Sequence, residues 1–282
     1  MSERRIWLCA DDYGISPGVN TGIRDLIVRG RLNATSVMVA APSFDKSEAA
    51  ALAMLNDGGE RRVAVGLHVT LTRPFKPLSR DFAPLRDGAF LPVNALLGRA
   101  MARRLQPDDF AIEIATQIKV FVERFGRAPD FIDGHQHAQL FPIIRDAFID
   151  VVRQAAPDAW VRQCGRAAAP LHRRLRDRKA IILDILSLGF RKRAEGAGLR
   201  TNPAFAGTYD FTPGADFAAL FPSFLDALPD GGLVMCHPGL VDAELERLDL
   251  LTDLREREYA YFGSPAFPAL LAERGVALAP PQ

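Results

Sequence analysis

Short apolar runs alternate with longer amphipathic segments along this chain. The first apolar run, residues 6–10, is continuous rather than alternating, which is typical of a strand buried on both faces. Ser16 then suits a helix N-cap and Pro17 the first helical position, so a helix is predicted over residues 17–29, with Gly30 as its stop. A strand that leads directly into a helix predicts a parallel βαβ unit.

The same alternation continues to the C-terminus. Further strands are predicted at residues 35–40, 63–71, 131–133, 159–162, 208–211, 233–236 and 276–278. Further helices are predicted at residues 45–56, 107–125, 142–155, 213–228, 248–262 and 265–274. Seven or eight strands, each followed by a helix or a loop, favour one barrel-like α/β domain over residues 1–282 rather than two domains.

Two segments interrupt this alternation. Residues 72–106 are broken by several prolines and predict a long loop with one short helix at 93–104, and such loops are often lids or substrate walls. Residues 166–200, the basic segment, contain ten Lys or Arg against three acidic residues, a local net charge of +7, around an apolar stretch at 181–190. The basic segment fits either a solvated helical excursion or a surface that contacts anionic lipid or a membrane-embedded substrate.

Composition narrows the class of protein. The 282 residues are 48% hydrophobic and 24% charged with a net charge of +1, which is ordinary for a globular enzyme and gives no reason to expect a nucleic-acid partner. The three cysteines are widely spaced, so buried thiols in a reducing compartment are expected. The N-terminal apolar run is too short for a signal peptide, and no later stretch approaches about 18 apolar residues. We therefore expect a cytoplasmic protein.

Ionisable residues gather where the predicted strands end. Asp11 and Asp12 are expected in the loop after the first strand, His68 late in the strand at 63–71, His135 and His137 after the strand at 131–133, and His237 after the strand at 233–236. A lone histidine at a strand end is more often a hydrogen-bonding residue than a ligand. The carboxyl ends of parallel strands, however, meet at one rim, so four such histidines of the five in the chain predict a shared site.

These residue types point to a divalent metal. Neighbouring carboxylates repel each other unless a cation holds them, and one carboxylate with two neutral imidazoles suits Zn²⁺ and similar ions. Three protein ligands leave a coordination position for water, which loses a proton near neutral pH when it is bound. The second carboxylate then remains as a base.

Four motifs resemble those of the YdjC-like carbohydrate deacetylase family. They are Ala10–Asp11–Asp12–Tyr13–Gly14 with Ser36–Val37–Met38–Val39, then Gly66–Leu67–His68–Val69–Thr70–Leu71, Ile132–Asp133–Gly134–His135–Gln136–His137 and Cys236–His237–Pro238–Gly239. The C-terminal third is most similar to the hopanoid-biosynthesis-associated HpnK subgroup, on Arg255–Glu256–Arg257–Glu258 and Ser264–Pro265–Ala266–Phe267. The resemblance spans nearly the whole chain in the family's order.

The resemblance implies a deformed (β/α) TIM-like barrel that uses one divalent ion, Mg²⁺ or Zn²⁺, to remove the acetyl group of an N-acetylated amino sugar. It implies that Asp12, His68 and His135 hold the metal. It also implies that Asp11 is the general base on the bound water and that His237 protonates the departing amine.

The sequence leaves the roles of several of these residues open. On an extended segment the side chains of His135 and His137 would face the same way, so either could be the ligand, and His137 could instead touch substrate. Asp133 could orient a ligand or satisfy loop amides. Arg162 could orient Asp11, bind substrate or form a surface salt bridge.

The substrate and partners are equally open. The sugar could be of the N-acetylglucosamine type, free or on a glycolipid such as a hopanoid, and peripheral contact with the inner membrane through residues 166–200 and a homodimer are both compatible with the sequence. Two rival functions are another divalent-metal hydrolase, acting on an amide or a phosphoester, and a non-catalytic barrel that binds a sugar or a lipid.

Overall fold

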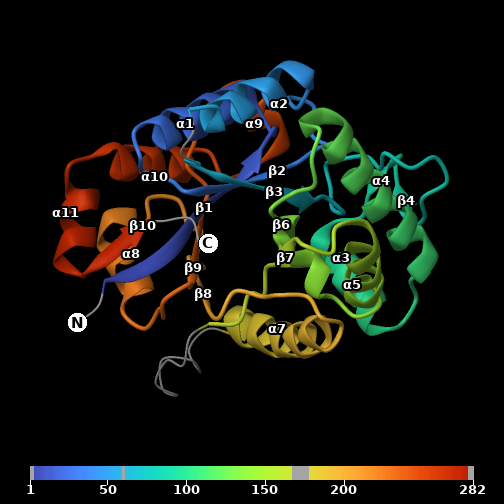
Figure 1. The fold of residues 1–282 in the computed structure, drawn as a ribbon. Coiled ribbons are helices and arrows are strands. Elements are labelled where there is room, and N and C mark those ends of the chain that lie inside the picture. The colour runs from blue at the N-terminus through green and yellow to red at the C-terminus, as the bar shows by residue number, and fades with distance from the viewer. Residues whose placement is uncertain (1–2, 59–60, 167–177, 279–282) are drawn as a thin grey trace.

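Parallel strands form a curled sheet in the order β7-β6-β3-β2-β1-β9-β8, and β10 pairs with the start of β1 (Figure 1). The computed structural model describes residues 3–58, 61–166 and 178–278. The strands of this sheet are β1 (Arg4–Tyr13), β2 (Ala34–Val37), β3 (Ala64–Val69), β6 (Phe131–Gly134), β7 (Trp160–Val161), β8 (Phe205–Ala206), β9 (Leu233–Cys236) and β10 (Val276–Leu278). The barrel-like α/β class predicted from the alternating pattern is confirmed.

Helices cover the outside of the curl. They are α1 (Pro17–Val28), α2 (Lys46–Ala53), α3 (Val93–Met101), α4 (Pro107–Phe125), α5 (Ile144–Ala155), α7 (Arg178–Gly196), α8 (Phe217–Leu225), α9 (Leu245–Leu248), α10 (Asp253–Gly263) and α11 (Ala266–Glu273), with 3-10 turns η1 (Met54–Asn56) and η2 (His135–Leu140). As predicted, Ser16 caps α1: its hydroxyl accepts a hydrogen bond from the Val19 N–H. Among the described residues, no helix is long and apolar enough to cross a membrane.

The two edges of the curl meet at a seam between β7 and β8. Isolated bridges join Val161 to Thr201 and Arg166 to Phe205. Between these bridges the side chain of Asn202 takes the place of a strand: its Oδ1 accepts from the Gln163 N–H at 2.9 Å, and its Nδ2 donates to the Gln163 carbonyl at 3.0 Å. The barrel is therefore deformed. At this seam the Asn202 amide bonds between two backbone hydrogen bonds, from the Val161 N–H to the Arg200 carbonyl and from the Phe205 N–H to the Gly165 carbonyl, in place of a continuous ladder.

Several predicted boundaries need correction. The strand expected at 208–211 lies instead at Phe205–Ala206, where it pairs with Leu233 and Val234 of β9. The helix expected at 248–262 is split into α9 and α10, and the strand at 35–40 ends at Val37. Asp11 and Asp12 do not lie in a loop after the first strand, because β1 continues through them to Tyr13.

Hydrogen bonds hold the long segment 72–106 against the rest of the protein. Besides the expected helix α3 it contains an unforeseen hairpin of β4 (Leu85–Arg86) and β5 (Ala89–Phe90). The buried Glu113 carboxylate on α4 accepts hydrogen bonds from the backbone N–H groups of Leu78 and Ser79. Charge-assisted bonds of this kind hold the loop against the barrel wall.

The basic segment is only partly described, since residues 167–177 lie outside the described residues. The described part is α7, which packs against η2 and α5 beneath the seam (Figure 1). A helical excursion is therefore confirmed for residues 178–196.

We predict that Asn202→Ala destabilises the fold by about 2–4 kcal/mol, because it leaves the buried N–H and C=O groups of Gln163 without partners. Urea unfolding followed by circular dichroism measures the change. Asn94→Ala, at an exposed position of α3, is the matched control and should shift stability by less than about 0.5 kcal/mol. Equal effects of the two substitutions would contradict the role of Asn202 in closing the barrel.

Candidate metal and catalytic site

The carboxyl ends of β1, β3, β6 and β9 open into one cavity of about 470 Å³. Its polar lining includes Asp11, Asp12, His68, His135, His137, His237 and Asp249. Its apolar lining includes Val93, Leu97, Phe141, Ile182, Leu183, Leu186, Phe211, Met235 and Leu251. The predicted gathering of strand-end residues at one rim is thus what the structure shows, with Asp133 and Arg162 buried behind the cavity wall.

Three of the predicted residues converge on one point. One ligand atom each from Asp12, His68 and His135 lies within 4.8 Å of the other two. Asp12 Oδ1 is 3.3 Å from His68 Nε2 and 2.9 Å from His135 Nδ1. An ion at this point would meet one oxygen and two imidazole nitrogens, which is a donor set suited to divalent metals.

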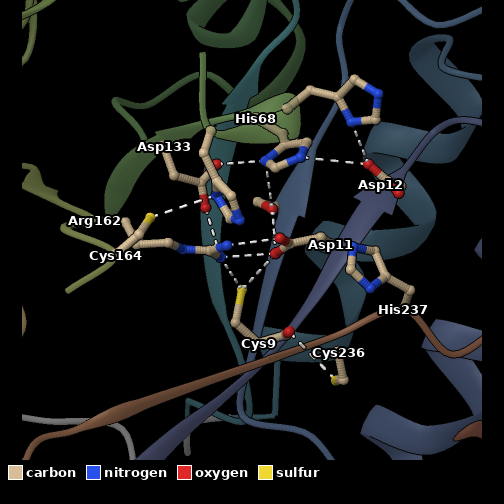
Figure 2. Close-up of polar contacts among 12 residues, drawn as sticks. Cys9, Asp11, Asp12, His68, Asp133, Arg162, Cys164, Cys236 and His237 are labelled. Atoms are coloured by element: carbon tan, nitrogen blue, oxygen red, sulfur yellow. Dashed lines mark hydrogen bonds and ion pairs between the residues drawn. The ribbon is translucent and has the colours of Figure 1, made fainter. Parts of the chain in front are cut away.

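The backbone explains how two adjacent acids point to different places. The pairing of β1 with β2 is irregular between Ala10 and Tyr13, and Asp12 takes a left-handed φ of 69°. This conformation is uncommon for a residue with a side chain, although Asp adopts it more readily than most. As a result, the carboxylate of Asp12 contacts His68 and His135, whereas that of Asp11 points toward Arg162 (Figure 2).

Arg162 holds Asp11 with two hydrogen bonds. Its Nη1 donates to Asp11 Oδ2 at 2.6 Å and its Nη2 donates to Asp11 Oδ1 at 2.7 Å, while Ser36 Oγ donates to Oδ1 at 3.0 Å. Burial alone would raise the pKa of Asp11, but the Arg162 guanidinium holds it well below its usual range. Asp11 is therefore a fixed carboxylate. Of the alternatives for Arg162, the structure places it against Asp11 and not at the surface, since only 1% of the residue is exposed.

Asp133 contacts His68 rather than loop amides. Its Oδ1 lies 2.5 Å from His68 Nδ1, and its Oδ2 lies 2.6 Å from Arg162 Nη2 (Figure 2). A carboxylate on Nδ1 keeps a proton there and directs Nε2 toward Asp12. Burial lowers the pKa of His68, but Asp133 and Asp11 raise it to about 10, so the surrounding carboxylates favour positive charge at this point.

Arg255, on α10, was not predicted as part of the site. It is buried, and its Nη2 donates to Asp12 Oδ2 at 2.6 Å and to Asp249 Oδ2 at 2.5 Å. The two carboxylate oxygens of Asp12 therefore have different partners: one faces Arg255, and the other faces the imidazoles of His68 and His135. Burial raises the pKa of Asp12, but His135 and Arg255 hold it well below its usual range, so Asp12 is ionised.

The prediction that His135 and His137 face the same way is wrong. His135 begins η2, and Gln136 and His137 both take left-handed backbone angles, which rotate the two rings apart. His137 Nδ1 lies 3.4 Å from the Sγ of Cys164, and its ring packs against Phe205. Of these two histidines, His135 contacts Asp12 together with His68, whereas His137 lies on the cavity wall.

His237 also lines the cavity, near Asp11 (Figure 2). Its backbone N–H donates to Glu258 Oε2 at 2.5 Å, and Glu258 Oε1 accepts from the Tyr209 hydroxyl at 2.7 Å. The ring nitrogen Nδ1 is buried and has no hydrogen-bond partner among the described residues. Burial lowers the pKa of His237, so its imidazole is neutral near pH 7.

A second group of possible donors, Cys9, Asp11 and Asp133, lies deeper in the barrel. The guanidinium of Arg162 already contacts all three side chains, so a cation is built into this group. Burial raises the pKa of the Cys9 thiol well above its usual range. The expected buried thiols are confirmed for all three cysteines of the chain.

A sequence signal for Arg255 and Glu258 existed but was ambiguous. They lie three residues apart in the run Arg255–Glu256–Arg257–Glu258, which by itself suggests a solvated helix face. In α10 this spacing puts both on the buried face. Only the packing of α10 against the barrel distinguishes them from their exposed neighbours.

The fold and the rim cluster define the class: a barrel-like α/β protein with an Asp–His–His donor set and a second acid beside it. Residues 5–273 match the family model described as YdjC-like protein, and the chain belongs to this family. Two relatives bear the name chitooligosaccharide deacetylase. That of Citrobacter koseri is 29% identical over 285 residues, covering 98% of this chain and 97% of the relative. That of Salmonella paratyphi B is 30% identical over 282 residues, covering 97% and 96%.

Solved structures share the fold. A protein of Enterococcus faecalis, named for cellobiose-phosphate cleavage, superposes with a TM-score of 0.75 at 20% identity and covers 99% of this chain and 97% of its own. The lactam utilization protein of Thermus thermophilus has a TM-score of 0.51 at 15% identity and covers 99% of both chains. At such identities the likeness concerns the fold alone.

We predict that Arg162→Met destabilises the protein by about 3–5 kcal/mol at pH 7, because it leaves Asp11 and Asp133 buried without their countercharge. Denaturant unfolding measures the loss. Arg99→Met, an exposed arginine on α3, is the control and should change stability by less than about 0.5 kcal/mol. A loss below about 1 kcal/mol for Arg162→Met would show that the two carboxylates do not depend on this arginine.

Proposed function

We propose that this protein is a metal-dependent carbohydrate N-deacetylase, a hydrolase of a non-peptide C–N bond that releases acetate from an N-acetylated amino sugar. The observation that carries the proposal is the convergence of Asp12, His68 and His135 beside a separate, arginine-held Asp11. The names of the curated relatives support the reaction class and a substrate of the N-acetylglucosamine type.

The residues present fit a single divalent ion. Asp12 Oδ1, His68 Nε2 and His135 Nδ1 would hold it, and Asp133 behind His68 is the carboxylate partner that histidine ligands commonly have. Two imidazoles in the donor set favour Zn²⁺ over Mg²⁺, although both are candidates. When bound, the ion would lower the pKa of water and polarise the amide carbonyl.

The chain's own groups would move the protons. Asp11, oriented by Arg162 and Ser36, would act as the general base toward the attacking water. His237, near Asp11, would protonate the departing amine. Because its pKa is lowered, His237 is neutral at rest, so the proton that Asp11 takes from the water would have to pass to its imidazole before it reaches the amine.

The rival functions fit these residues less well. Phosphoester hydrolysis commonly uses two metal ions about 3.5–4 Å apart, but the deeper Cys9–Asp11–Asp133 group is already filled by Arg162. A non-catalytic sugar- or lipid-binding barrel has no use for a carboxylate held rigidly beside a metal-type cluster. Of the rival functions, hydrolysis of another amide fits these residues best.

The cavity wall supports an amphiphilic substrate. Beyond the polar rim cluster, α3 and α7 contribute Val93, Leu97, Leu183 and Leu186, which offer a sugar few hydrogen-bond partners. An N-acetylglucosaminyl lipid, such as the hopanoid glycolipid expected for the HpnK subgroup, would place its sugar at the metal site and its apolar part against this wall. A free oligosaccharide would leave the wall uncovered.

We predict that the purified protein releases amine from N-acetylglucosamine-containing substrates, and that the glycolipid has a higher kcat/KM than di-N-acetylchitobiose. Asp11→Asn should lower kcat by about 10²–10⁴-fold, because it removes the general base. Amine release measured with a fluorogenic reagent checks both statements.

Asp108→Asn, at an exposed position of α4, is the matched control and should retain activity. No amine release from any substrate in the panel by metal-loaded protein would overturn the proposed function. Equal rates on both substrates would overturn only the preference for a glycolipid.

We predict that Asp133→Asn weakens divalent metal affinity by about 10–100-fold, because His68 loses the carboxylate that orients its ring. Calorimetric titration of the metal-stripped protein with Zn²⁺ gives the affinity without relying on activity. The Asp108→Asn protein should bind Zn²⁺ as the wild type does. Stoichiometric binding unchanged by both Asp133→Asn and His68→Ala would place the metal elsewhere.

A further inference from the structure

Helix α7 carries apolar side chains on two opposite sides. Leu186, Phe190 and Ala194 face the protein and are buried. Ile182, Ile185 and Leu188, the α7 ridge, follow one another at intervals of three residues along the other side. An apolar helix face is normally buried, so three large apolar side chains on the outer side of α7 are unusual for a solvated helix.

The α7 ridge is strongly exposed. Ile182 is 51%, Ile185 67% and Leu188 72% exposed to solvent. Single exposed apolar residues are ordinary, but three in a row on one helix face form a contiguous patch of the kind that marks an interaction site.

The α7 ridge is continuous with the substrate cavity. Ile182 belongs to the ridge and also lines the cavity, and Leu183 and Leu186 on the neighbouring face extend the same lining inward. An occupant of the ridge would therefore lie at the mouth of the cavity, about one helical turn from its wall.

The charges near the α7 ridge favour an anionic partner. Helix α7 itself has five Lys or Arg against two acidic residues, a net charge of +3. Both acidic residues are paired: Asp184 accepts from Arg166 at 2.8 Å, and Glu195 accepts from Arg191 at 2.7 Å. Lys192 is exposed four residues after Leu188, on the same face, where its stem can lie along the ridge with its ammonium toward solvent.

We propose that the α7 ridge is a peripheral docking surface for an anionic lipid bilayer. Ile185 and Leu188 would enter the interfacial zone of the bilayer while the ammonium of Lys192 meets the headgroups. The cavity mouth would then open at the membrane surface, where an amphiphilic substrate could enter without crossing water. The inference rests on the proposed function only in taking this cavity as the substrate site.

Vesicle flotation of the full-length protein tests the proposal. The protein should float with vesicles of phosphatidylcholine and phosphatidylglycerol at about 3:1 but not with phosphatidylcholine alone, and about 0.5 M NaCl should weaken its binding. The double variant Ile185→Asp, Leu188→Asp should lower the bound fraction by about tenfold or more. Neither residue lines the cavity, so amine release from di-N-acetylchitobiose should be unchanged.

Ile112→Asp is the matched control, since Ile112 is 59% exposed on α4, and it should float as the wild type does. Absence of flotation, or equal flotation of the wild type and the double variant, would overturn the proposal. So would a wild-type dimer in sedimentation that the double variant converts to monomers, because the ridge would then be a contact between two copies of the chain. Flotation without any deacetylation would contradict the proposed function and leave the docking surface supported.

Discussion

The buried ion pairs of Arg162 are the constraint on which the site depends. Burying a guanidinium in the barrel interior costs free energy, which its ion pairs with Asp11 and Asp133 offset. The two buried carboxylates depend on the guanidinium in the same way. The two acids in turn set the geometry of the rim: Asp11 is fixed as a base, and Asp133 orients the ring of His68. One cation from β7's end thus organises residues that come from β1, β3 and β6.

A second arginine makes the neighbouring acids chemically different. Asp11 lies against Arg162, and Asp12 divides its oxygens between Arg255 and the two imidazoles. Adjacent carboxylates would otherwise share similar environments and raise each other's pKa. The left-handed backbone at Asp12 makes the two carboxylates point in different directions, and each carboxylate pairs with a different arginine. This division lets one acid serve as a ligand and its neighbour as a base in the proposed reaction.

The order of strands and helices could be predicted because apolar runs and helix caps are local signals. Ser16 and Pro17 begin α1 as expected, and Asp11, Asp12, His68, His135 and His237 do share one rim. The strand at 208–211 was misplaced, because β8 is only two residues long and its position is decided by pairing with β9. The prediction that His135 and His137 face the same way was wrong for a similar reason. The left-handed backbone angles in η2 cannot be predicted from the sequence, because the residues that adopt them are not glycine.

The class of fold and the set of rim residues could be inferred from the sequence, since hydrophobic periodicity reports which elements form and parallel strands bring their carboxyl ends together. The tertiary structure explains why Asp12 rather than Asp11 faces the imidazoles and why His137 turns away from them, and it adds Arg255 to the site. Those choices depend on backbone angles and on contacts between residues far apart in the chain, such as the 243 positions that separate Arg255 from Asp12. Local patterns carry no information about such contacts until the barrel has closed.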